Sequence, residues 1–230
     1  MTGEHMDVLR KTSLFHGIPP DELAGMLDCL SPMVESYEKN EFIAMEGDRI
    51  SAIYILLSGG VTLLKETVKG SSLIITKLEE GDMFGETSAF SRERLWAATV
   101  MANERCYVMR ISPGNITGVC GHGCRSHRSL IQNMVGILAE KALLLNKRLQ
   151  YLSMLGLRAR ICSFLYDIYN REKSATFRLG YNREELAQYL GTARPSLSRE
   201  LGNMKNEGII DYYKSSVKIK DLNKIIDGIT

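Results

Sequence analysis

The densest group of side chains that could do chemistry lies in a short loop. Cys120, His122, Cys124 and His127 place two thiols and two imidazoles within eight residues. Four such groups could close a tetrahedral zinc site, or the two thiols could act as a redox pair. The spacing is not that of a standard zinc knuckle, and glycines around Cys and His are equally typical of an ordinary loop before a helix. We therefore assign no metal and keep these four residues as candidates.

Catalytic constellations are not recognisable in the sequence. It contains no Ser/His/acid set, no paired-carboxylate site and no phosphate-binding loop, and the two remaining histidines, His5 and His16, lie in the opening segment. The sequence therefore predicts a protein that is not an enzyme, and it implies no certain cofactor.

Residues 183–205 have the pattern of two short helices joined by a tight turn. Gly191 permits the left-handed backbone of the turn, Thr192 offers a hydroxyl to the start of the second helix, and Pro195 suits its first turn. The apolar positions that would face inward at helical spacing are Leu186, Ala187, Leu190, Leu197, Leu201 and Met204. This pattern is typical of a helix-turn-helix.

The outward residues of the second helix suit contact with double-stranded DNA. Arg199 lies one turn into the helix, where its guanidinium can donate two hydrogen bonds to guanine O6 and N7. Thr192 and Arg194 lie where phosphates approach, and the hydroxyls of Ser196 and Ser198 can reach bases or phosphates. These five residues are the predicted DNA-binding set.

The charge distribution agrees with this assignment only when the chain is divided. The 230 residues include 29 basic and 27 acidic side chains, a net charge of +2 that by itself gives no reason to expect DNA binding. Residues 1–152 carry 16 basic and 18 acidic side chains, whereas residues 153–230 carry 13 and 9. The basic excess is confined to the C-terminal part, as expected if that part binds DNA.

Composition indicates a folded protein of the cytoplasm. The chain is 44% hydrophobic and 24% charged, its five cysteines are an odd number, and no secretory leader is recognisable. No apolar stretch approaches the roughly 18 residues that span a bilayer. We expect a reducing, cytoplasmic setting and no membrane partner.

The predicted elements change along the chain. Residues 1 to about 40 are expected to form short helices, with a helix start at residues 19–22. Turn signals then separate six short apolar runs, which predict an antiparallel barrel or sandwich: residues 42–45, 53–57, 61–64, 73–78, 97–101 and 106–111. Two further strand-like runs lie within residues 208–219.

A long helix is predicted from about residue 126 to 153, where there is no proline and one glycine. One apolar seam follows steps of four and three over three heptads: Ile131, Val135, Leu138, Ala142, Leu145, Leu149 and Leu152. A two-stranded coiled coil would bury this seam, although it could instead pack on the protein's own barrel. A second stripe, Leu130, Met134, Ile137 and Leu144, is available for the barrel, so we expect a homodimer.

The order of these parts resembles the Crp/Fnr superfamily of bacterial transcription regulators. The resemblance covers essentially the whole chain and rests on several segments together: residues 14–15, 46–48, 55–61, 81–86, 159–161 and 194–201. It implies an α+β fold. Residues 1–125 would form an N-terminal antiparallel β-roll (jelly-roll-like) sensor domain with short N-terminal helices. A long dimerisation helix and hinge would occupy residues 126–153, and a C-terminal winged helix-turn-helix residues 154–230.

The resemblance also implies an effector pocket at Gly85 and Glu86. Members that bind cyclic nucleotides follow this segment with an Arg-Ser pair that holds the phosphate, and the matching residues here are Trp96 and Ala97. The indole has no charge, which argues against cyclic AMP or GMP, although loop arginines Arg92 and Arg94 could substitute. The candidate pocket residues are Phe84, Gly85, Glu86, Thr87, Ser88, Trp96, Ala97, Ala98, Leu145 and Asn146.

Such a pocket suggests an apolar or aromatic small molecule, or a degenerate site that Trp96 fills without any ligand. The resulting hypothesis is a homodimeric transcription regulator, gated by an unidentified small effector, that reads a palindromic DNA operator and contacts RNA polymerase if it is an activator. Two alternatives stay open: a redox- or metal-responsive regulator using Cys120, His122, Cys124 and His127, and a cyclic-nucleotide-responsive member. An iron–sulfur sensor is disfavoured, because the first 40 residues contain only Cys29.

Overall fold

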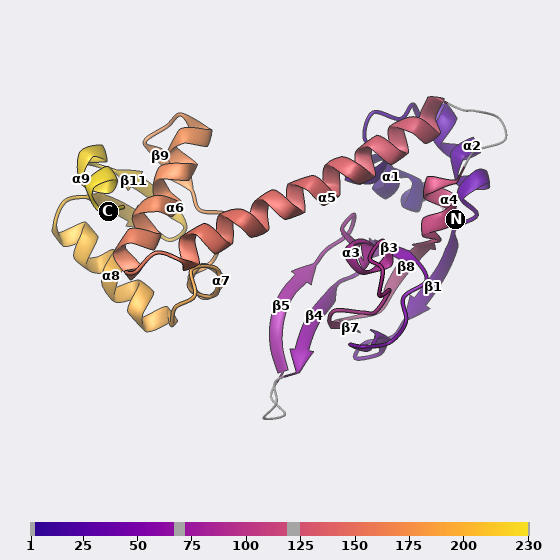
Figure 1. The fold of residues 1–230 in the computed structure, drawn as a ribbon, viewed down its shortest axis with the longest axis horizontal. Coiled ribbons are helices and arrows are strands. Elements are labelled where there is room, and N and C mark those ends of the chain that lie inside the picture. Colours follow the sequence, from indigo (N-terminus) through magenta and orange to yellow (C-terminus); the bar gives the residue numbers. More distant parts are fainter. Residues whose placement is uncertain (1–2, 67–71, 119–124, 230) are drawn as a thin grey trace. The chain divides into compact units, whose positions relative to one another are not determined.

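The computed structural model describes residues 3–66, 72–118 and 125–229. The chain divides into two compact units, Met1–Ala139 and Glu140–Thr230, which are described in turn (Figure 1). The division falls within the long helix α5 (Arg125–Leu152).

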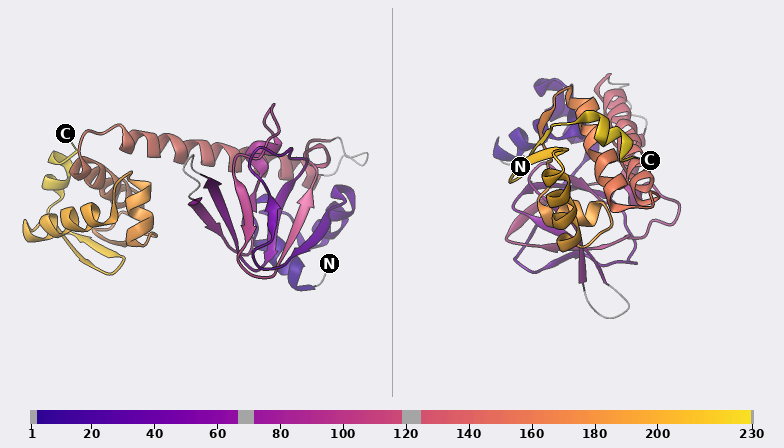
Figure 2. Two further views of the ribbon diagram at one scale, coloured as in Figure 1. Left: turned by 90° about the horizontal axis from the view of Figure 1, so that it is seen from below. Right: turned by 90° about the vertical axis from the view of Figure 1, so that its left-hand side faces the viewer.

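The first unit consists of short helices around two antiparallel sheets (Figure 2). Its helical elements are α1 (Gly3–Lys11), η1 (Ser13–Phe15), α2 (Pro20–Leu30), α3 (Glu86–Ala89) and α4 (Pro113–Thr117). One sheet has the order β1-β8-β3-β6 and the other β2-β7-β4-β5. The strands are β1 (Met33–Tyr37), β2 (Phe42–Ala44), β3 (Ile53–Ser58), β4 (Val61–Glu66), β5 (Ser72–Leu78), β6 (Met83–Phe84), β7 (Thr99–Ala102) and β8 (Cys106–Ile111).

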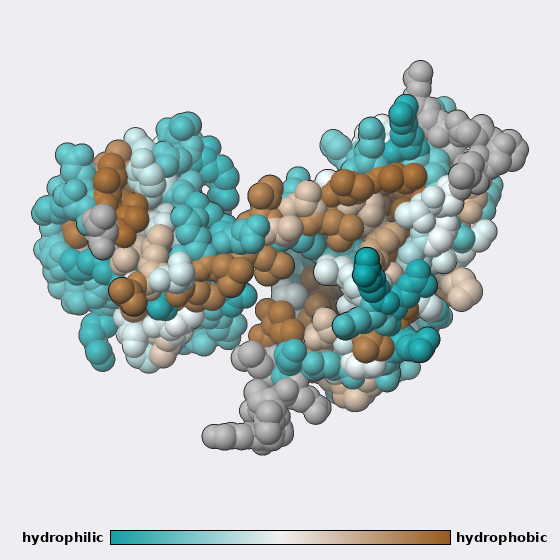
Figure 3. All heavy atoms as spheres, viewed as in Figure 1, coloured by the Kyte–Doolittle hydropathy of each residue, from teal (hydrophilic) through white to brown (hydrophobic). Residues whose placement is uncertain are grey.

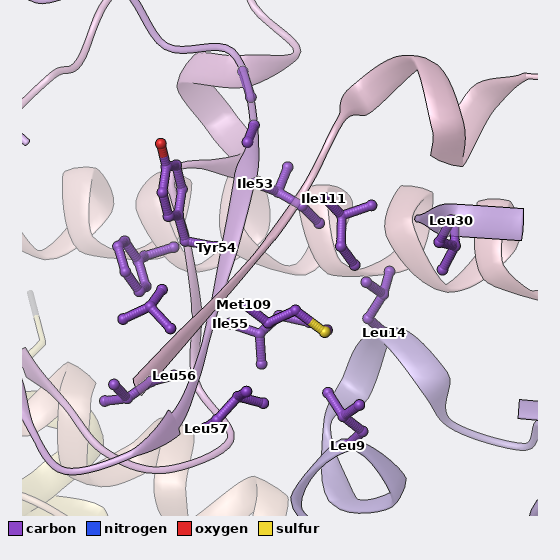
Figure 4. Close-up of a cluster of buried hydrophobic side chains, with 14 of the residues drawn as sticks. Leu9, Leu14, Leu30, Ile53, Tyr54, Ile55, Leu56, Leu57, Met109 and Ile111 are labelled. Carbon is purple, nitrogen blue, oxygen red and sulfur yellow. The ribbon is translucent and has the colours of Figure 1, made fainter. Parts of the chain in front are cut away.

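The core of this unit lies where the helices pack on the first sheet (Figure 4). Strand β3 is apolar and buried from Ile53 to Leu57, as expected for a strand between two others. Leu9, Leu14 and Leu30 from the helical elements are fully buried with it. Each buried leucine contributes about 1.5–3 kcal/mol relative to exposure, so these contacts fix the helices to the sheet.

The expectation of helices through residue 40 is wrong in its last part. Residues Met33–Tyr37 form strand β1, which pairs over its whole length with β8. Glu35 and Tyr37 gain their hydrogen-bond partners there, since the hydroxyl of Tyr37 donates to Glu35 at 2.6 Å and Arg110 of β8 pairs with the same carboxylate. This stabilisation depends on a strand more than 60 residues away, so local spacing could not reveal it.

Helix α5 packs on the core of the first unit with only part of the apolar stripe that the sequence predicts for this contact. Leu130 and Met134 are buried, and Ile137 packs against the core, as predicted. Leu144 does not follow them, because its side chain is 63% exposed. Leu138, assigned to the other seam, is also partly packed on this core. The apolar residues of α5 that remain uncovered gather along the helix on the surface (Figure 3).

The second unit surrounds the end of α5 with three helices, a short sheet and a final helix. These are α6 (Leu157–Glu172), β9 (Thr176–Arg178), α7 (Arg183–Tyr189), α8 (Arg194–Asn206), β10 (Ile210–Tyr213), β11 (Ser216–Ile219) and α9 (Leu222–Asp227). The sheet order is β10-β11-β9, with β10 and β11 forming the hairpin expected after the helix pair. We call this hairpin, residues 210–219, the wing.

The turn between α7 and α8 has the predicted glycine geometry. Gly191 adopts φ +64°, and a Cβ at this position would lie 2.5 Å from Cδ2 of Leu152. Pro195 lies in the first turn of α8 as expected, but the predicted capping role of Thr192 is wrong. The helix begins two residues later, at Arg194, with Ala193 as its N-cap and no side-chain cap hydrogen bond.

Within the part of the chain that the structure describes, no helix is both long and apolar enough to cross a bilayer.

Candidate DNA-binding and effector sites

Helix α8 is oriented by one buried face. Leu197, Leu201 and Met204 are almost completely buried in the core of the second unit. Spacing of four and three places them on one side of the helix, so the residues between them face outward. The outward positions include four of the five predicted DNA-binding residues, which are exposed: Arg194, Ser196, Ser198 and Arg199. Thr192, the fifth, is half-buried in the preceding turn.

The guanidiniums of Arg194 and Arg199 are free to bind another molecule. Among the ion pairs and hydrogen bonds of the described residues, none involves either side chain. By contrast, Glu200 on the same helix pairs with Arg158. A long cationic side chain without an internal partner can donate its full set of N–H groups to a base edge or a phosphate.

A positioning residue that the sequence analysis missed is Arg158, on α6. It pairs with Glu200 and donates a two-pronged hydrogen bond to Glu207, at 2.7 and 2.6 Å. These contacts tie α8 to α6 at both its middle and its end. The interaction lowers the pKa of Glu207 from its ordinary value of 4.5, chiefly through the hydrogen bonds from Arg158. An arginine six residues after the end of α5, with acids at positions 200 and 207, is a weak sequence signal, because the paired residues lie far apart in the chain.

The end of α5 is joined to the turn of the helix pair. Arg148 donates a hydrogen bond to the carbonyl oxygen of Gln188 at 3.0 Å, and Arg160 donates to those of Leu190 and Met154 at 3.1 Å each. These are carbonyls at the C-terminal end of α7 and in the hinge, which have no partner inside a helix. The hinge and the turn are therefore held by the same guanidinium.

The expected effector cassette is filled by aromatic side chains. Trp96 is only 7% exposed, and its ring centroid lies 5.1 Å from that of Tyr54 and 6.3 Å from that of Phe84. Gly85 has φ +78°, and a Cβ there would lie 2.9 Å from the Trp96 ring. The indole therefore lies directly against the glycine of the cassette.

The remaining candidate pocket residues are only partly brought together. Glu86 is buried and accepts a hydrogen bond from the hydroxyl of Thr87 at 2.8 Å, while Ala98 is buried and Ala97 exposed. Ser88 is half-buried. Leu145 and Asn146 belong to the second compact unit, where both side chains are exposed.

A charged group beside this aromatic cluster was not found from the sequence. The guanidinium of Arg110 lies 5.8 Å from the ring centroid of Tyr54, on the strand next to it, and pairs with Glu35. Arg92 and Arg94, the arginines considered as substitutes, are exposed on the loop before Trp96. Arg110 therefore places a cation beside the ring cluster.

Of the four candidate metal ligands, one lies among the described residues. Cys120, His122 and Cys124 lie outside the described residues. His127 is buried, and its Nε2 lies 2.8 Å from the carbonyl oxygen of Ile116. Among the described residues, no three His, Cys, Asp or Glu side chains are grouped to hold a metal ion.

Two family models match the chain in the order that this architecture requires. A cyclic nucleotide-binding domain model matches residues 34–122, and a Crp-like helix-turn-helix domain model matches residues 159–227. A Pasteurella multocida protein described as the cAMP-activated global transcriptional regulator CRP is 24% identical over 197 residues, covering 81% of this chain and 89% of that protein. The chain belongs to the Crp/Fnr superfamily.

Solved structures agree with this fold. The catabolite activator protein of Thermus thermophilus matches with a TM-score of 0.55 at 23% identity, covering 95% of this chain and 98% of that one. A CooA variant from Carboxydothermus hydrogenoformans matches with a TM-score of 0.62 at 22% identity, covering 90% of each chain. At these identities the likeness concerns the fold alone.

The Crp/Fnr assignment confirms the coarse function expected from the sequence. The chain is a DNA-binding transcription regulator with a cyclic nucleotide-binding-like domain. The region matched by the first family model includes Gly85 and Trp96, so the aromatic cluster described above lies within that domain. The region matched by the second includes α7, α8 and the wing.

We expect Arg158→Ala to destabilise the second unit of this Crp/Fnr regulator in a pH-dependent way. Exposed ion pairs usually contribute little, but a two-pronged arginine–carboxylate pair linking two helices is better ordered than most. Because the pKa of Glu207 is lowered, its contribution is present above the ordinary value of 4.5 and is lost as the pH falls through the lowered pKa. The gap in thermal midpoint between wild type and variant should therefore be widest near neutral pH and close in acid.

The measurement is thermal unfolding followed by circular dichroism from pH 3 to 7. Arg171→Ala is the matched control, since Arg171 lies on the same helix and its one ion pair among the described residues is with its neighbour Glu172 at the surface. A gap that stays constant across this pH range would contradict the assignment of the interaction to Glu207.

Proposed function

We propose that this regulator acts as a homodimer, joined along α5, that reads a two-fold symmetric operator and is gated by a small apolar or aromatic effector other than a cyclic nucleotide. The observation that carries the dimer is the uncovered seam of α5. Val135, Leu145 and Leu149 are each at least 61% exposed, although all three belong to the apolar heptad pattern.

A second copy is the partner that fits this seam best. Large apolar side chains repeated along one helix are costly to expose, and a parallel copy of the same helix buries them in matching positions. A two-fold axis along α5 would present two copies of α8 to one duplex. Such dimers bind half-sites about one helical turn apart, so the operator is expected to be palindromic.

The base-reading role falls to Arg199, with Ser196 and Ser198 beside it on the exposed face of α8. Arg194 and Thr192 would contact phosphates at the start of the helix. Pro195 stands where some relatives have a base-reading glutamate, so the operator sequence of those relatives does not transfer to this chain. The same proposal places the protein in the cytoplasm and, if it activates transcription, in contact with RNA polymerase.

The effector proposal rests on the chemistry of the cassette. Trp96 occupies the position where nucleotide-binding relatives place the arginine that neutralises the cyclic phosphate, and its ring covers Gly85. Apolar and aromatic surface from Tyr54, Phe84 and Trp96 favours an uncharged or aromatic molecule, which would displace or stack on the indole. Arg110 beside Tyr54 would supply one polar contact at the edge of this surface.

The reading helix is tested by Arg199→Ala. Losing a bidentate contact to guanine should weaken binding to a selected operator by about 1–3 kcal/mol and relax the preference at one base pair of each half-site. Binding is measured by fluorescence anisotropy on the operator and on single-base variants. Arg171→Ala, an exposed arginine on α6, is the control and should leave affinity unchanged. Equal affinity of wild type and Arg199→Ala would refute the assignment.

The dimer is tested by Leu145→Asp combined with Leu149→Asp. Charges facing each other across a coiled-coil seam should convert the protein to a monomer in sedimentation velocity at micromolar concentration. Leu143→Asp is the matched control, because Leu143 is 67% exposed but lies outside the seam. A double variant that remains dimeric, or a wild type that is already monomeric, would rule out this interface.

The effector class is tested by titrating cyclic AMP in a calorimeter. Without a charge-assisted contact between an arginine and the cyclic phosphate, the binding free energy for cyclic AMP should weaken by about 1.5–3 kcal/mol or more. We therefore expect no saturable binding at micromolar concentrations. The double variant Trp96→Arg with Ala97→Ser restores the expected pair and should gain measurable affinity, whereas Trp96→Phe should not. Micromolar binding by the unmodified protein would overturn the proposal.

A further inference from the structure

The exposed face of α8 continues beyond the residues that the sequence analysis assigned to DNA. Asn203 follows Arg199 by four positions, and Arg199 follows Ser196 by three. These spacings place the three side chains on one side of the helix, where they form a stripe along two turns. All three residues are exposed. In helix-turn-helix proteins the base-reading residues of the second helix can occupy two successive turns, so Asn203 lies within the reading range of α8.

Asn203 is held by a chain of contacts that starts on α6. Its Nδ2 donates a hydrogen bond to Oε2 of Glu200 at 3.3 Å, and Arg158 donates to Oε1 of the same carboxylate. The side chain of Glu200 is only 20% exposed, and Arg158 is itself fixed by two hydrogen bonds to Glu207. The carboxylate of Glu200 is therefore a fixed acceptor that limits the orientations of the Asn203 amide.

The groups of this amide that remain free match one base. A side-chain amide has a carbonyl oxygen that accepts hydrogen bonds and two N–H groups that donate them. Glu200 uses one N–H of Asn203, and among the hydrogen bonds of the described residues none is accepted by the Asn203 Oδ1. One donor and one acceptor are thus left side by side. In the major groove adenine offers the complementary pair, its N7 acceptor and its N6 donor, whereas guanine offers two acceptors.

The residue before Asn203 leaves room for a duplex. Gly202 lies inside α8, where glycine is a poorer helix former than alanine. Among the described residues, a Cβ at Gly202 would have no neighbour within 4 Å beyond the backbone of its own helix, so internal packing does not require a glycine here. Close approach of the helix backbone to a molecule outside the chain would require one. The third turn of α8 is therefore suited to lie close to DNA.

We propose that Asn203 is a second base-reading residue of α8 and that it reads one adenine in each half-site of the operator. Its Oδ1 accepts a hydrogen bond from N6, its remaining N–H donates to N7, and Glu200 is the positioning residue for the amide. Four residues of an α-helix span about 6 Å and stacked bases lie about 3.4 Å apart, so the adenine is expected about two base pairs from the guanine read by Arg199. This inference rests on the proposed reading of an operator by α8.

The first test is operator selection from a random duplex library by the full-length wild type and by Asn203→Ala. The variant should prefer adenine at one base pair of each half-site roughly 5- to 150-fold less, and it should keep its preference at every other position. Asn170→Ala, the same change at an exposed asparagine of α6, is the matched control and should select the wild-type operator. An unchanged selection by Asn203→Ala would overturn the proposal.

The second test removes one atom from the base. Substitution of that adenine by 7-deazaadenine deletes the N7 acceptor, and fluorescence anisotropy should show weaker binding by the wild type. Asn203→Ala should be indifferent to the substitution, because it has already lost the donor. Equal weakening of both proteins would show that Asn203 does not contact N7.

The same operator pair tests the positioning role of Glu200. The weakening caused by 7-deazaadenine should become smaller in Glu200→Ala, which no longer orients the amide. It should be retained in Glu200→Gln, whose side-chain oxygen still accepts a hydrogen bond. Equal weakening in the wild type and Glu200→Ala would refute this role.

Gly202→Ala tests the close approach of α8 to the duplex. Its thermal midpoint should rise, because alanine is the better helix former and the added Cβ meets no neighbour outside its own helix among the described residues. Its operator affinity should fall, because the Cβ occupies space that the duplex needs. A variant that is more stable and binds the operator as tightly as the wild type would contradict the close approach.

The outcomes separate this inference from the proposed function. A wild type that binds no DNA sequence refutes both. A wild type that selects an operator with an Arg199-dependent guanine, but shares every base preference with Asn203→Ala, refutes only the reading by Asn203. If Asn203→Ala weakens binding to all sequences alike, Asn203 contacts the DNA backbone or supports the fold, and base reading is wrong; circular dichroism of the variant distinguishes these two roles.

Discussion

The close approach of Leu152 to Gly191 is the constraint on which the DNA-reading half of the molecule depends. The glycine has φ +64°, and any side chain there would meet Leu152 at 2.5 Å. Arg160 closes the same joint, since it donates hydrogen bonds to the carbonyls of Met154, Leu190 and Gly191. Helix α8 begins only three residues after Gly191, so its direction is set by how the end of α5 lies against the turn.

This joint gives a physical route from a dimer contact to the reading helix. Leu152 is the last position of the proposed seam, yet it is only 36% exposed, compared with 63% for Leu149 one turn earlier. Part of its surface is committed to the turn and part remains for a second copy. An effector shifts an equilibrium only through different affinities for the two states. A change in seam packing at Leu152 would reach Gly191 without any intervening element, which makes this pair the shortest link between the two functions.

The parts predicted well from the sequence are those whose stability is local. The helix pair follows from Gly191, Pro195 and the spacing of three inward residues. The six apolar runs match strands because each is short and is bounded by turn residues. Strand β1 was missed because Glu35 is stabilised by Arg110, far along the chain. The cap was misassigned to Thr192 because the N-cap of α8 is Ala193, so the helix starts one residue later than a cap at Thr192 implies. The sequence alone shows that Trp96 brings no charge to the cassette. That the Trp96 ring lies against Gly85 depends on the folded structure.

Net charge alone does not show which cations are available to bind DNA. Whether each cation already has a carboxylate partner shows more. Arg110, in the first unit, has its charge balanced by Glu35, and Arg158, in the second, by Glu200 and Glu207. These pairs hold strands and helices together and leave little field outside. Arg194 and Arg199, by contrast, have no carboxylate partner among the described residues. An excess of four positive charges would be a weak attraction if it were spread over paired groups. Concentrated on a few cations without internal partners, the same excess provides directed donors for phosphates and base edges.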